Sequence, residues 1–260
     1  MDGLGPLAGA DHGFMVVVLG GFRLLWGTSV QVSVPAGSQR LLALLALHGG
    51  AIKRAAVAGM LWPDSSESHA YSNLRSALAR LSRTARKALA VSKLELDLAE
   101  GVSVDIRQAQ ALARRLLDPA LTPGRSELGT TAVAALSGDL LPQWDDDWLL
   151  LEAEDWRQLR LHALEALARR LIAAGRWGEA AHAACAAVRA EPLRESAHSA
   201  LIQVHLAEGN QSEAVREFAR YRALLQAELG LEPTHQLRQL VQNLQGSRNL
   251  RSRPRSDDRL

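Results

Sequence analysis

The chain has 260 residues, of which 47% are hydrophobic and 22% are charged. This length predicts about two domains, and the composition is that of a globular protein with a buried core, which argues against a disordered, collagen-like or coiled-coil protein. The 30 basic and 28 acidic residues leave a net charge of +2, so the average charge indicates no class of partner. A single cysteine, Cys185, excludes an internal disulfide and a cysteine-rich metal site.

No stretch of the sequence is apolar for long enough to cross a membrane. The longest uninterrupted apolar run, Leu41–Leu47, has seven residues, whereas a spanning helix needs about 20. Residues 1–12 contain two aspartates and neither lysine nor arginine, so they lack the basic start of a secretory signal. We therefore expect a cytoplasmic protein with no membrane partner.

The N-terminal part alternates short apolar runs with turns. Residues 1–13 are rich in glycine and show no periodicity, and we expect a mobile leader there. The segments Phe14–Leu19, Phe22–Trp26 and Val30–Val34 are rich in β-branched and aromatic residues and are separated by glycines. This pattern predicts a small antiparallel β-unit.

Three helices are expected next. The leucines that follow Ser38, a candidate N-cap, have helical spacing as far as Gly49. A short second helix is expected over Arg54–Leu61, before a Trp-Pro dipeptide. The third helix is expected over about Glu67–Leu89, after a cluster of residues that favour caps.

Polar and apolar residues then alternate, which predicts a β-hairpin between Leu89 and Val104 with Lys93 near its tip. Three helices followed by a hairpin form a winged helix-turn-helix. We therefore expect residues 14–104 to form a winged-helix domain with a small β-sheet and a wing.

Almost everything beyond Asp105 has helical periodicity. The expected helices are Asp105–Leu117, Glu127–Ser137, Asp146–Gly175, Trp177–Ala190, Arg194–Glu208, Gln211–Gly230 and Thr234–Leu244. Residues 105–245 are therefore expected to form one helical domain. Residues 246–260 are rich in Arg, Ser, Pro and Asp with almost no apolar residues, so we expect a disordered basic tail there.

The helical region contains an internal repeat. An offset of 34 residues pairs Ala163 with Ala197 and Gly175 with Gly209, and a proline follows each second helix. This period, with two helices joined by a glycine-containing turn, is the tetratricopeptide signature. The fold class expected for the whole chain is mainly α: a winged helix followed by a tetratricopeptide-like repeat domain.

Positive charge is concentrated near the expected third helix. No acidic residue lies between Ser72 and Leu94. The basic residues of this window are Arg75, Arg80, Arg83, Arg86, Lys87 and Lys93. The region 104–156 is acidic by contrast. Basic charge collected on one helix is the electrostatic footprint of nucleic-acid binding.

The third helix is amphipathic when it is drawn at 100° per residue. Its apolar side consists of Ala70, Leu74, Ala77, Leu78 and Leu81, which we expect to face the core. The residues expected to contact DNA are His69, Ser72, Asn73, Arg75, Ser76, Arg80 and Arg83, together with Lys93 of the wing. Arg reads guanine, Asn reads adenine, and Ser contacts bases or phosphates in the major groove. The competing interpretation is a solvated amphipathic helix with surface arginines.

Sequence motifs along most of the chain add a family resemblance. The first part carries Arg40-Leu-Leu-Ala-Leu-Leu-Ala, Leu61-Trp-Pro, Asn73-Leu-Arg-Ser-Ala-Leu-Ala-Arg-Leu and a Val104-Asp junction. The second carries Gly138-Asp-Leu-Leu-Pro, Trp144-Asp-Asp-Asp-Trp, Glu191-Pro-Leu-Arg-Glu-Ser-Ala-His and Glu228-Leu-Gly-Leu-Glu-Pro. The chain resembles a Streptomyces antibiotic regulatory protein-type activator, which joins a winged helix to a bacterial transcriptional activation domain.

The resemblance implies a transcription activator that binds repeated sites in double-stranded promoter DNA and contacts RNA polymerase. It also leaves open a homodimer on DNA. The chain lacks the G-x-x-x-x-G-K-[ST] sequence of the nucleotide-binding module that some relatives carry. Acidic residues in the hairpin oppose phosphate contacts from the wing, so we expect the third helix to make the main contacts.

Two other functions stay open from the sequence: a repeat-based protein-interaction scaffold, and a sensor that holds a small molecule between the two domains. No catalytic constellation is present, so we expect neither an enzyme nor a cofactor. Asp145–Asp147 is better explained by helix capping than by a metal site. Cys185 is expected to be buried and inert. Trp144, Trp148, Trp156 and Trp177 are expected to be core anchors.

Overall fold

The structure is a computed structural model that describes residues 13–27, 29–121, 123–124 and 127–249, with side chains described as far as residue 242. Residues 1–12 of the expected leader at 1–13 and residues 250–260 of the expected tail at 246–260 lie outside these residues, whereas residues 246–249 of that tail are helical. The chain divides into two compact units, one made of residues 1–111 and 138–158 and the other of 112–137 and 159–260. No helix in the described ranges combines the length and apolar character that a membrane crossing requires.

The first unit begins with a four-stranded sheet. Its strands are β1 (Phe14–Val17), β2 (Arg23–Trp26), β3 (Val30–Val32) and β7 (Ser103–Val104), in the order β3-β2-β1-β7. The first three strands are antiparallel, as the sequence predicts. β7 runs parallel to β1, with Val16 opposite Val104. Ser103 and Val104, which were predicted to end the hairpin, therefore belong to the four-stranded sheet instead.

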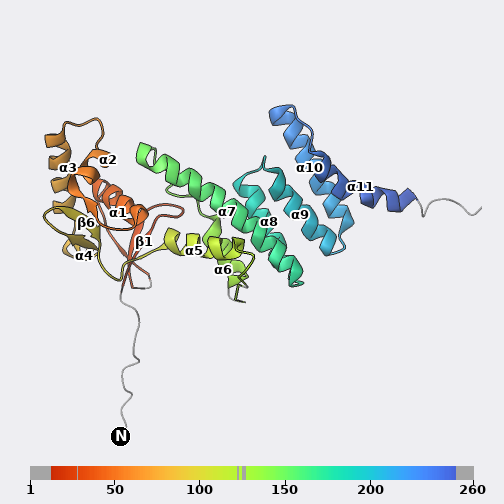
Figure 1. The fold of residues 1–260 in the computed structure, drawn as a ribbon, viewed down its shortest axis with the longest axis horizontal. Helices are drawn as coiled ribbons and strands as arrows, with labels where there is room; N and C mark the ends of the chain where they lie inside the picture. The colour runs from red at the N-terminus through yellow and green to blue at the C-terminus, as the bar shows by residue number, and fades with distance from the viewer. Residues whose placement is uncertain (1–12, 28, 122, 125–126, 250–260) are drawn as a thin grey trace, which may run out of the picture. The chain divides into compact units, whose positions relative to one another are not determined.

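Three helices follow the first strands (Figure 1). They are α1 (Ala36–His48), α2 (Arg54–Leu61) and α3 (Glu67–Ala79). The N-cap of α1 is Pro35, so the prediction of Ser38 as a cap is wrong. Ser38 is instead fully buried, and its hydroxyl donates a hydrogen bond of 2.7 Å to the carbonyl oxygen of Ala77 in α3. This bond joins the first turn of α1 to the last turn of α3.

The expected third helix is two helices. α3 ends at Ala79, and a short helix, α4, covers Arg83–Arg86. The hydroxyl of Ser82 accepts a hydrogen bond from the N–H of Ala85, which starts a new helix at this point. The guanidinium of Arg86 donates to the carbonyl oxygen of Leu78 and satisfies one of the free acceptors at the end of α3.

The wing is a three-stranded sheet rather than a two-stranded hairpin. The strands β4 (Ile52–Lys53), β5 (Leu89–Val91) and β6 (Glu95–Leu98) have the order β4-β6-β5. The turn between β5 and β6 contains Lys93, as expected. The hydroxyl of Ser92 accepts hydrogen bonds from two backbone N–H groups in this turn.

A segment far along the sequence completes the first unit. Leu140 forms a β-bridge with Leu19, and the N–H of Leu141 donates to the carbonyl oxygen of Val18 at 3.0 Å. The carboxylate of Asp105 accepts hydrogen bonds from the N–H groups of Val18 and Leu19, both at 3.0 Å. Burial raises the pKa of the Asp105 carboxyl, and the three backbone N–H donors that it contacts oppose that shift. The end of β1 is therefore bonded from two sides.

The second unit consists of helices, and α5 and α7 contribute residues to both units. The helices are α5 (Asp105–Leu117), α6 (Thr130–Ser137), α7 (Asp147–Ala173), α8 (Trp177–Ala190), α9 (Glu195–Ala207), α10 (Gln211–Leu229) and α11 (His235–Asn249). These bounds lie close to the predicted ones, except that α6 starts later and α11 continues past the predicted end at Leu244. Figure 1 shows α8, α9 and α10 packed in succession.

The predicted repeat is visible in the backbone. Gly175 and Gly209, which are 34 residues apart, have φ angles of 69° and 81° and occupy the turns before α8 and α10. Glycine adopts this left-handed conformation readily because it has no Cβ atom. Alanines fill the contacts between the helices, and Ala163 and Ala197 are both fully buried.

A buried polar network lies within the repeats. The Nδ1 atom of His198 is 2.7 Å from a carboxylate oxygen of Glu217, and its Nε2 atom is 2.8 Å from the carbonyl oxygen of Pro192. The ring of His198 stacks on Tyr221 at 4.3 Å between centroids. The hydrogen bond from His198 holds the pKa of the Glu217 carboxyl below its usual value.

The four tryptophans that were predicted to be core anchors differ in their exposure to solvent. Trp156 is buried, as expected, and its indole N–H donates to the carbonyl oxygen of Gly138. Trp144 and Trp148 are half-buried. Trp177 is 43% exposed at the start of α8, so its assignment as a core anchor is wrong. Cys185 is half-buried rather than buried, and burial raises the pKa of its thiol.

Candidate nucleic-acid interface

The two sides of α3 differ as the sequence predicts. Ala70, Leu74 and Ala77 are buried, each at most 4% exposed. Leu81, just beyond the helix, is also buried, and Leu78 is half-buried. The exposed residues of the opposite side are His69, Ser72, Arg75, Ser76, Ala79 and Arg80. The core contacts of α3 therefore leave a polar, basic side of the helix open to solvent.

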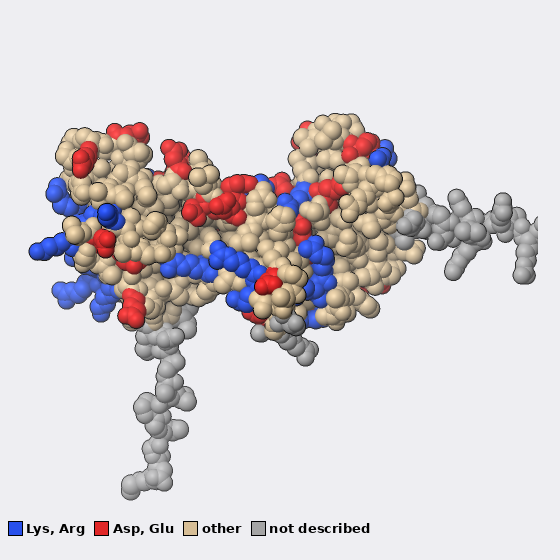
Figure 2. Space-filling model, in the orientation of Figure 1, with Lys and Arg blue, Asp and Glu red and all other residues tan. Residues whose placement is uncertain are grey.

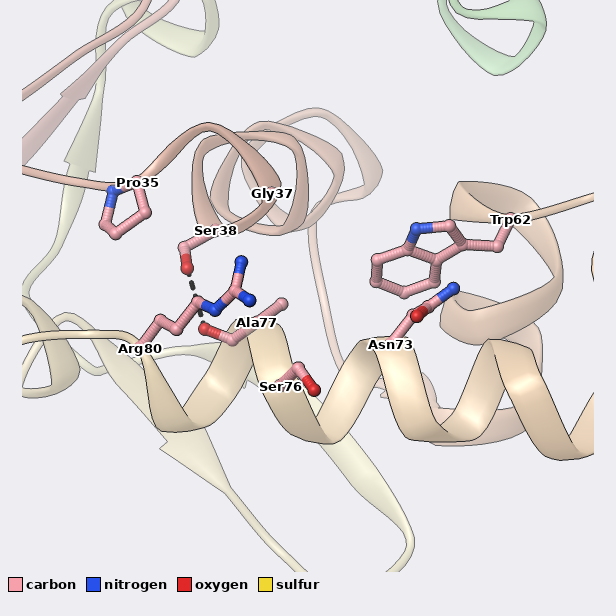
Figure 3. A pocket seen from close by; sticks show the side chains of 8 residues that line it. All are labelled: Pro35, Gly37, Ser38, Trp62, Asn73, Ser76, Ala77 and Arg80. Carbon is pink, nitrogen blue, oxygen red and sulfur yellow. Dashed lines mark hydrogen bonds between the residues drawn. The ribbon is translucent and has the colours of Figure 1, made fainter.

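Three of the expected contact residues, His69, Ser72 and Asn73, differ in their exposure and in their neighbours. The ring of His69 is 3.1 Å from the hydroxyl of Ser66, so it is tied to the start of the helix. Asn73 is only half-buried and lies beside the Trp62 ring (Figure 3). Ser72 is exposed on the helix surface.

Arg80 closes α3 at its C-terminal end. Figure 3 shows its side chain folded back over Ala77 towards the first turn of α1, beside Ser38. A hollow of about 230 Å³ lies here. Its lining residues are Pro35, Gly37, Ser38, Trp62, Asn73, Ser76, Ala77 and Arg80. The hollow thus brings three of the expected contact residues together with the first turn of α1.

Arg83 and Lys93 lie outside α3. Arg83 is the first residue of α4, so the helical wheel that placed it on the face of Arg80 does not apply. Lys93 lies in the turn between β5 and β6 and is exposed. Within the described residues, neither side chain forms an ion pair with a carboxylate.

Positive charge gathers on this part of the first unit. Figure 2 shows lysine and arginine side chains over the part of the first unit where Figure 1 places α3, α4 and β6. Arg86 and Arg54 are partly engaged, since they donate to the carbonyl oxygens of Leu78 and Ser92. Arg75 and Arg80 form no ion pair within the part of the chain that is described, so their charge is available to a ligand.

Sequence reasoning missed the bond from Ser38 to α3 and two further features around this surface. The buried hydroxyl of Ser38 and the ring of Trp62 come from α1 and from the end of α2. Ser38 shares a helix face with Leu41 and Leu45, and this position on an otherwise apolar face could have indicated a buried hydroxyl. The ion pair between Arg40 and Asp146, which ties α1 to the start of α7, joins residues 106 positions apart and left no local signal.

Comparison with known proteins identifies relatives that match most of the chain. Regulatory protein AfsR from Streptomyces griseus is 29% identical over 87% of this chain, and regulatory protein AfsR from Streptomyces coelicolor is 30% identical over 87%. In both cases the match covers 24% of the relative, so this chain spans about a quarter of their length. These relatives confirm the resemblance to the Streptomyces antibiotic regulatory protein-type activators.

A solved structure shows the same fold. The structure of Mycobacterium tuberculosis EmbR in complex with a low affinity phosphopeptide matches 93% of this chain and 66% of its own, with a TM-score of 0.59 and 22% identity. The likeness confirms the expected architecture of a winged helix followed by helical repeats.

The family assignment rests on a match over more than half of the sequence. The bacterial transcriptional activator domain matches residues 103–245, which include all of α5 to α10 and most of α11. This chain therefore belongs to the bacterial transcriptional activator domain family.

Proposed function

We propose that the chain is a transcription activator that binds repeated sites in promoter DNA through the outward side of α3 and contacts RNA polymerase. Membership in the bacterial transcriptional activator domain family and the two regulatory relatives support this proposal. The observation that carries the DNA-binding part is the solvent-exposed, acid-free surface of α3 around Arg75, Ser76 and Arg80.

The dimensions of α3 suit a duplex. Its 13 residues give a length of about 20 Å at 1.5 Å per residue, and the major groove, about 12 Å wide, admits an α-helix. Small side chains at Ser72, Ser76 and Ala79 allow the helix backbone to approach the bases closely. Arg75 extends from the same side and has the geometry to bind guanine with two hydrogen bonds.

We assign Arg80 to the phosphate backbone. Its guanidinium lies over the hollow beside the first turn of α1, which has no acidic residue and no side-chain cap. A phosphate oxygen at this place would meet the guanidinium and the hydroxyl of Ser76. Contacts of this kind fix the position of a protein on DNA without reading the sequence.

The neighbouring elements have supporting roles. Arg83 on α4 and Lys93 in the wing are exposed and carry positive charge towards adjacent phosphates. Glu95, Asp97 and Glu100 follow Lys93 closely, and their negative charge weakens attraction to the wing. We therefore propose that α3 supplies most of the binding free energy and the wing supplies little.

Genomic-fragment selection tests the proposal. The purified chain is mixed with sheared genomic DNA of its host, and bound fragments are sequenced and footprinted. We expect enrichment of promoter regions that contain two or more copies of one short sequence, each protected in the footprint. Retention of all fragments in proportion to their abundance would contradict sequence-specific binding.

A further inference from the structure

The first turns of α7 expose two large apolar side chains. Leu150 is 58% exposed and Leu151 is 79% exposed, although the adjacent Leu149 is buried. Acidic residues flank the pair along the same side of the helix: Asp147 lies one turn before it, and Glu154 and Asp155 lie one turn after it. We call Asp147, Leu150, Leu151, Glu154 and Asp155 the acidic leucine face.

This face lies opposite the side by which α7 is anchored. At 100° per residue, its five members span about 140°, centred roughly opposite Leu149 and Trp156, which are 2% and 1% exposed. The indole N–H of Trp156 donates to the carbonyl oxygen of Gly138 at 2.8 Å. Asp146, directly before the helix, is paired with Arg40 of α1. The exposed leucines are therefore presented by a fixed helix, not by a loose end.

The charge of the face limits what can cover it. Asp147 and Asp155 are exposed and have no ion-pair partner among the described residues, whereas Glu154 is paired with Arg157. DNA is repelled by these carboxylates. A symmetric contact with a second copy would set like charges against each other, which is unfavourable. A basic protein surface with an apolar pocket complements both the carboxylates and the leucines.

We infer that the acidic leucine face docks on a basic, apolar-pocketed surface of RNA polymerase holoenzyme. This inference rests on the proposed function, because a promoter-bound activator acts by contacting the polymerase. Two adjacent exposed leucines supply the apolar anchors, and the carboxylates on either side supply complementary charge, which sets specificity and the rate of association.

The test compares two pairs of exposed leucines in the full chain. Leu150→Ser with Leu151→Ser alters the face, and Leu229→Ser with Leu231→Ser is the matched control, since these residues are 54% and 55% exposed elsewhere. Binding to purified holoenzyme from the host is measured by biolayer interferometry without DNA. We expect about a tenfold or greater loss of affinity for the first pair, equivalent to about 1.4 kcal/mol or more, and less than a twofold change for the control.

A charge variant and a DNA assay complete the design. Asp155→Lys is expected to weaken polymerase binding several-fold, with a slower association rate, and circular dichroism checks that each variant is folded. Promoter-DNA affinity, measured separately, is expected to be unchanged in all variants. Equal polymerase affinity of the two leucine pairs, while the wild type binds, would overturn the inference. Absence of polymerase binding or of DNA binding by the wild type would instead contradict the proposed function.

Discussion

The hydroxyl of Ser38 in α1 is held 2.7 Å from the carbonyl oxygen of Ala77 in α3, and Ser38 has no exposed surface. Because α3 ends at Ala79, the carbonyl of Ala77 belongs to the last turn, where acceptors lack partners within the helix. The bond therefore satisfies a buried acceptor and fixes the end of α3 against α1, directly beneath Arg80.

Replacement of Ser38 tests this bond. Ser38→Ala leaves the carbonyl oxygen of Ala77 buried without its side-chain donor, and we expect a loss of about 1–3 kcal/mol in the free energy of unfolding. Urea titration followed by circular dichroism measures it. Ser72→Ala on the exposed side of α3 is the control, with an expected change within about 0.5 kcal/mol. Equal stability of the two variants would contradict the role given to Ser38.

Arginine replacements test the DNA surface. Arg75→Ala is expected to cost about 1–3 kcal/mol on the selected promoter site and to relax the sequence preference, because Arg75 is assigned to a base. Arg80→Ala is expected to weaken binding to all sequences alike and to reduce the dependence of affinity on salt, because Arg80 is assigned to phosphate. Fluorescence anisotropy at several salt concentrations distinguishes these effects.

Arg114 provides the control for those variants. It is an exposed arginine on α5, outside the proposed surface. Arg114→Ala is expected to leave both the affinity and its salt dependence unchanged. If Arg75→Ala and Arg114→Ala had the same effect, the outward side of α3 would not be the DNA-binding surface.

A glycine pair tests the segment that completes the first unit. A Cβ atom on Gly138 would lie 3.1 Å from the Cβ of Leu19 and 3.4 Å from the backbone nitrogen of Gly20. Gly138→Ala is therefore expected to cost about 1–3 kcal/mol through overpacking. Gly59→Ala in α2 meets nothing within 4 Å and is expected to stabilise by about 0.5–1 kcal/mol through helix propensity. Thermal unfolding measures both changes. If the two variants changed stability in the same direction, the close packing of Gly138 against Leu19 would be contradicted.

The His198–Glu217 contact predicts a pH dependence. The folded-state pKa of Glu217 is lowered from its ordinary value of 4.5, chiefly by the hydrogen bond with His198. A lowered folded-state pKa contributes stability that is present above the unfolded-state pKa and is lost as pH falls through the folded-state value. Wild-type protein is therefore expected to lose part of its advantage over Glu217→Gln as pH falls below about 4.5.

Urea unfolding across a series of pH values measures that difference. Glu213→Gln is the control, because Glu213 forms an exposed pair with Arg216, and such pairs contribute little to stability. A gap between wild type and Glu217→Gln that stays constant down to pH 3 would contradict the prediction.

The helices of the second unit could be predicted closely because each has a long amphipathic pattern and the repeat supplies a second copy of it. α8 matches its predicted bounds, and α9 and α10 differ by a residue at some ends. Trp177 was misplaced because an aromatic side chain at a helix start does not reveal by itself whether it is covered.

The first unit depends more on contacts between distant residues. The break after Ala79 was hidden because Leu81 continues the apolar spacing of the helix, while Ser82 and Arg86 decide where it ends. The two-residue strand β7 is too short to show a pattern, and its partner lies almost 90 residues away. The outward residues of α3 were predictable because their exposure follows from the buried side.

The end of β1 is bonded to Asp105, Leu140 and Leu141. These bonds determine where the chain can be truncated to produce the first unit alone. A fragment cut after Val104 would strip β1 of these partners and expose Leu19 and its neighbours to solvent. The end of β1 keeps these partners, and the helix that anchors them, only when the polypeptide extends through Trp156. A truncation intended to isolate the winged helix should therefore retain the stretch that begins at Gly138, or aggregation through the bared strand becomes the expected outcome.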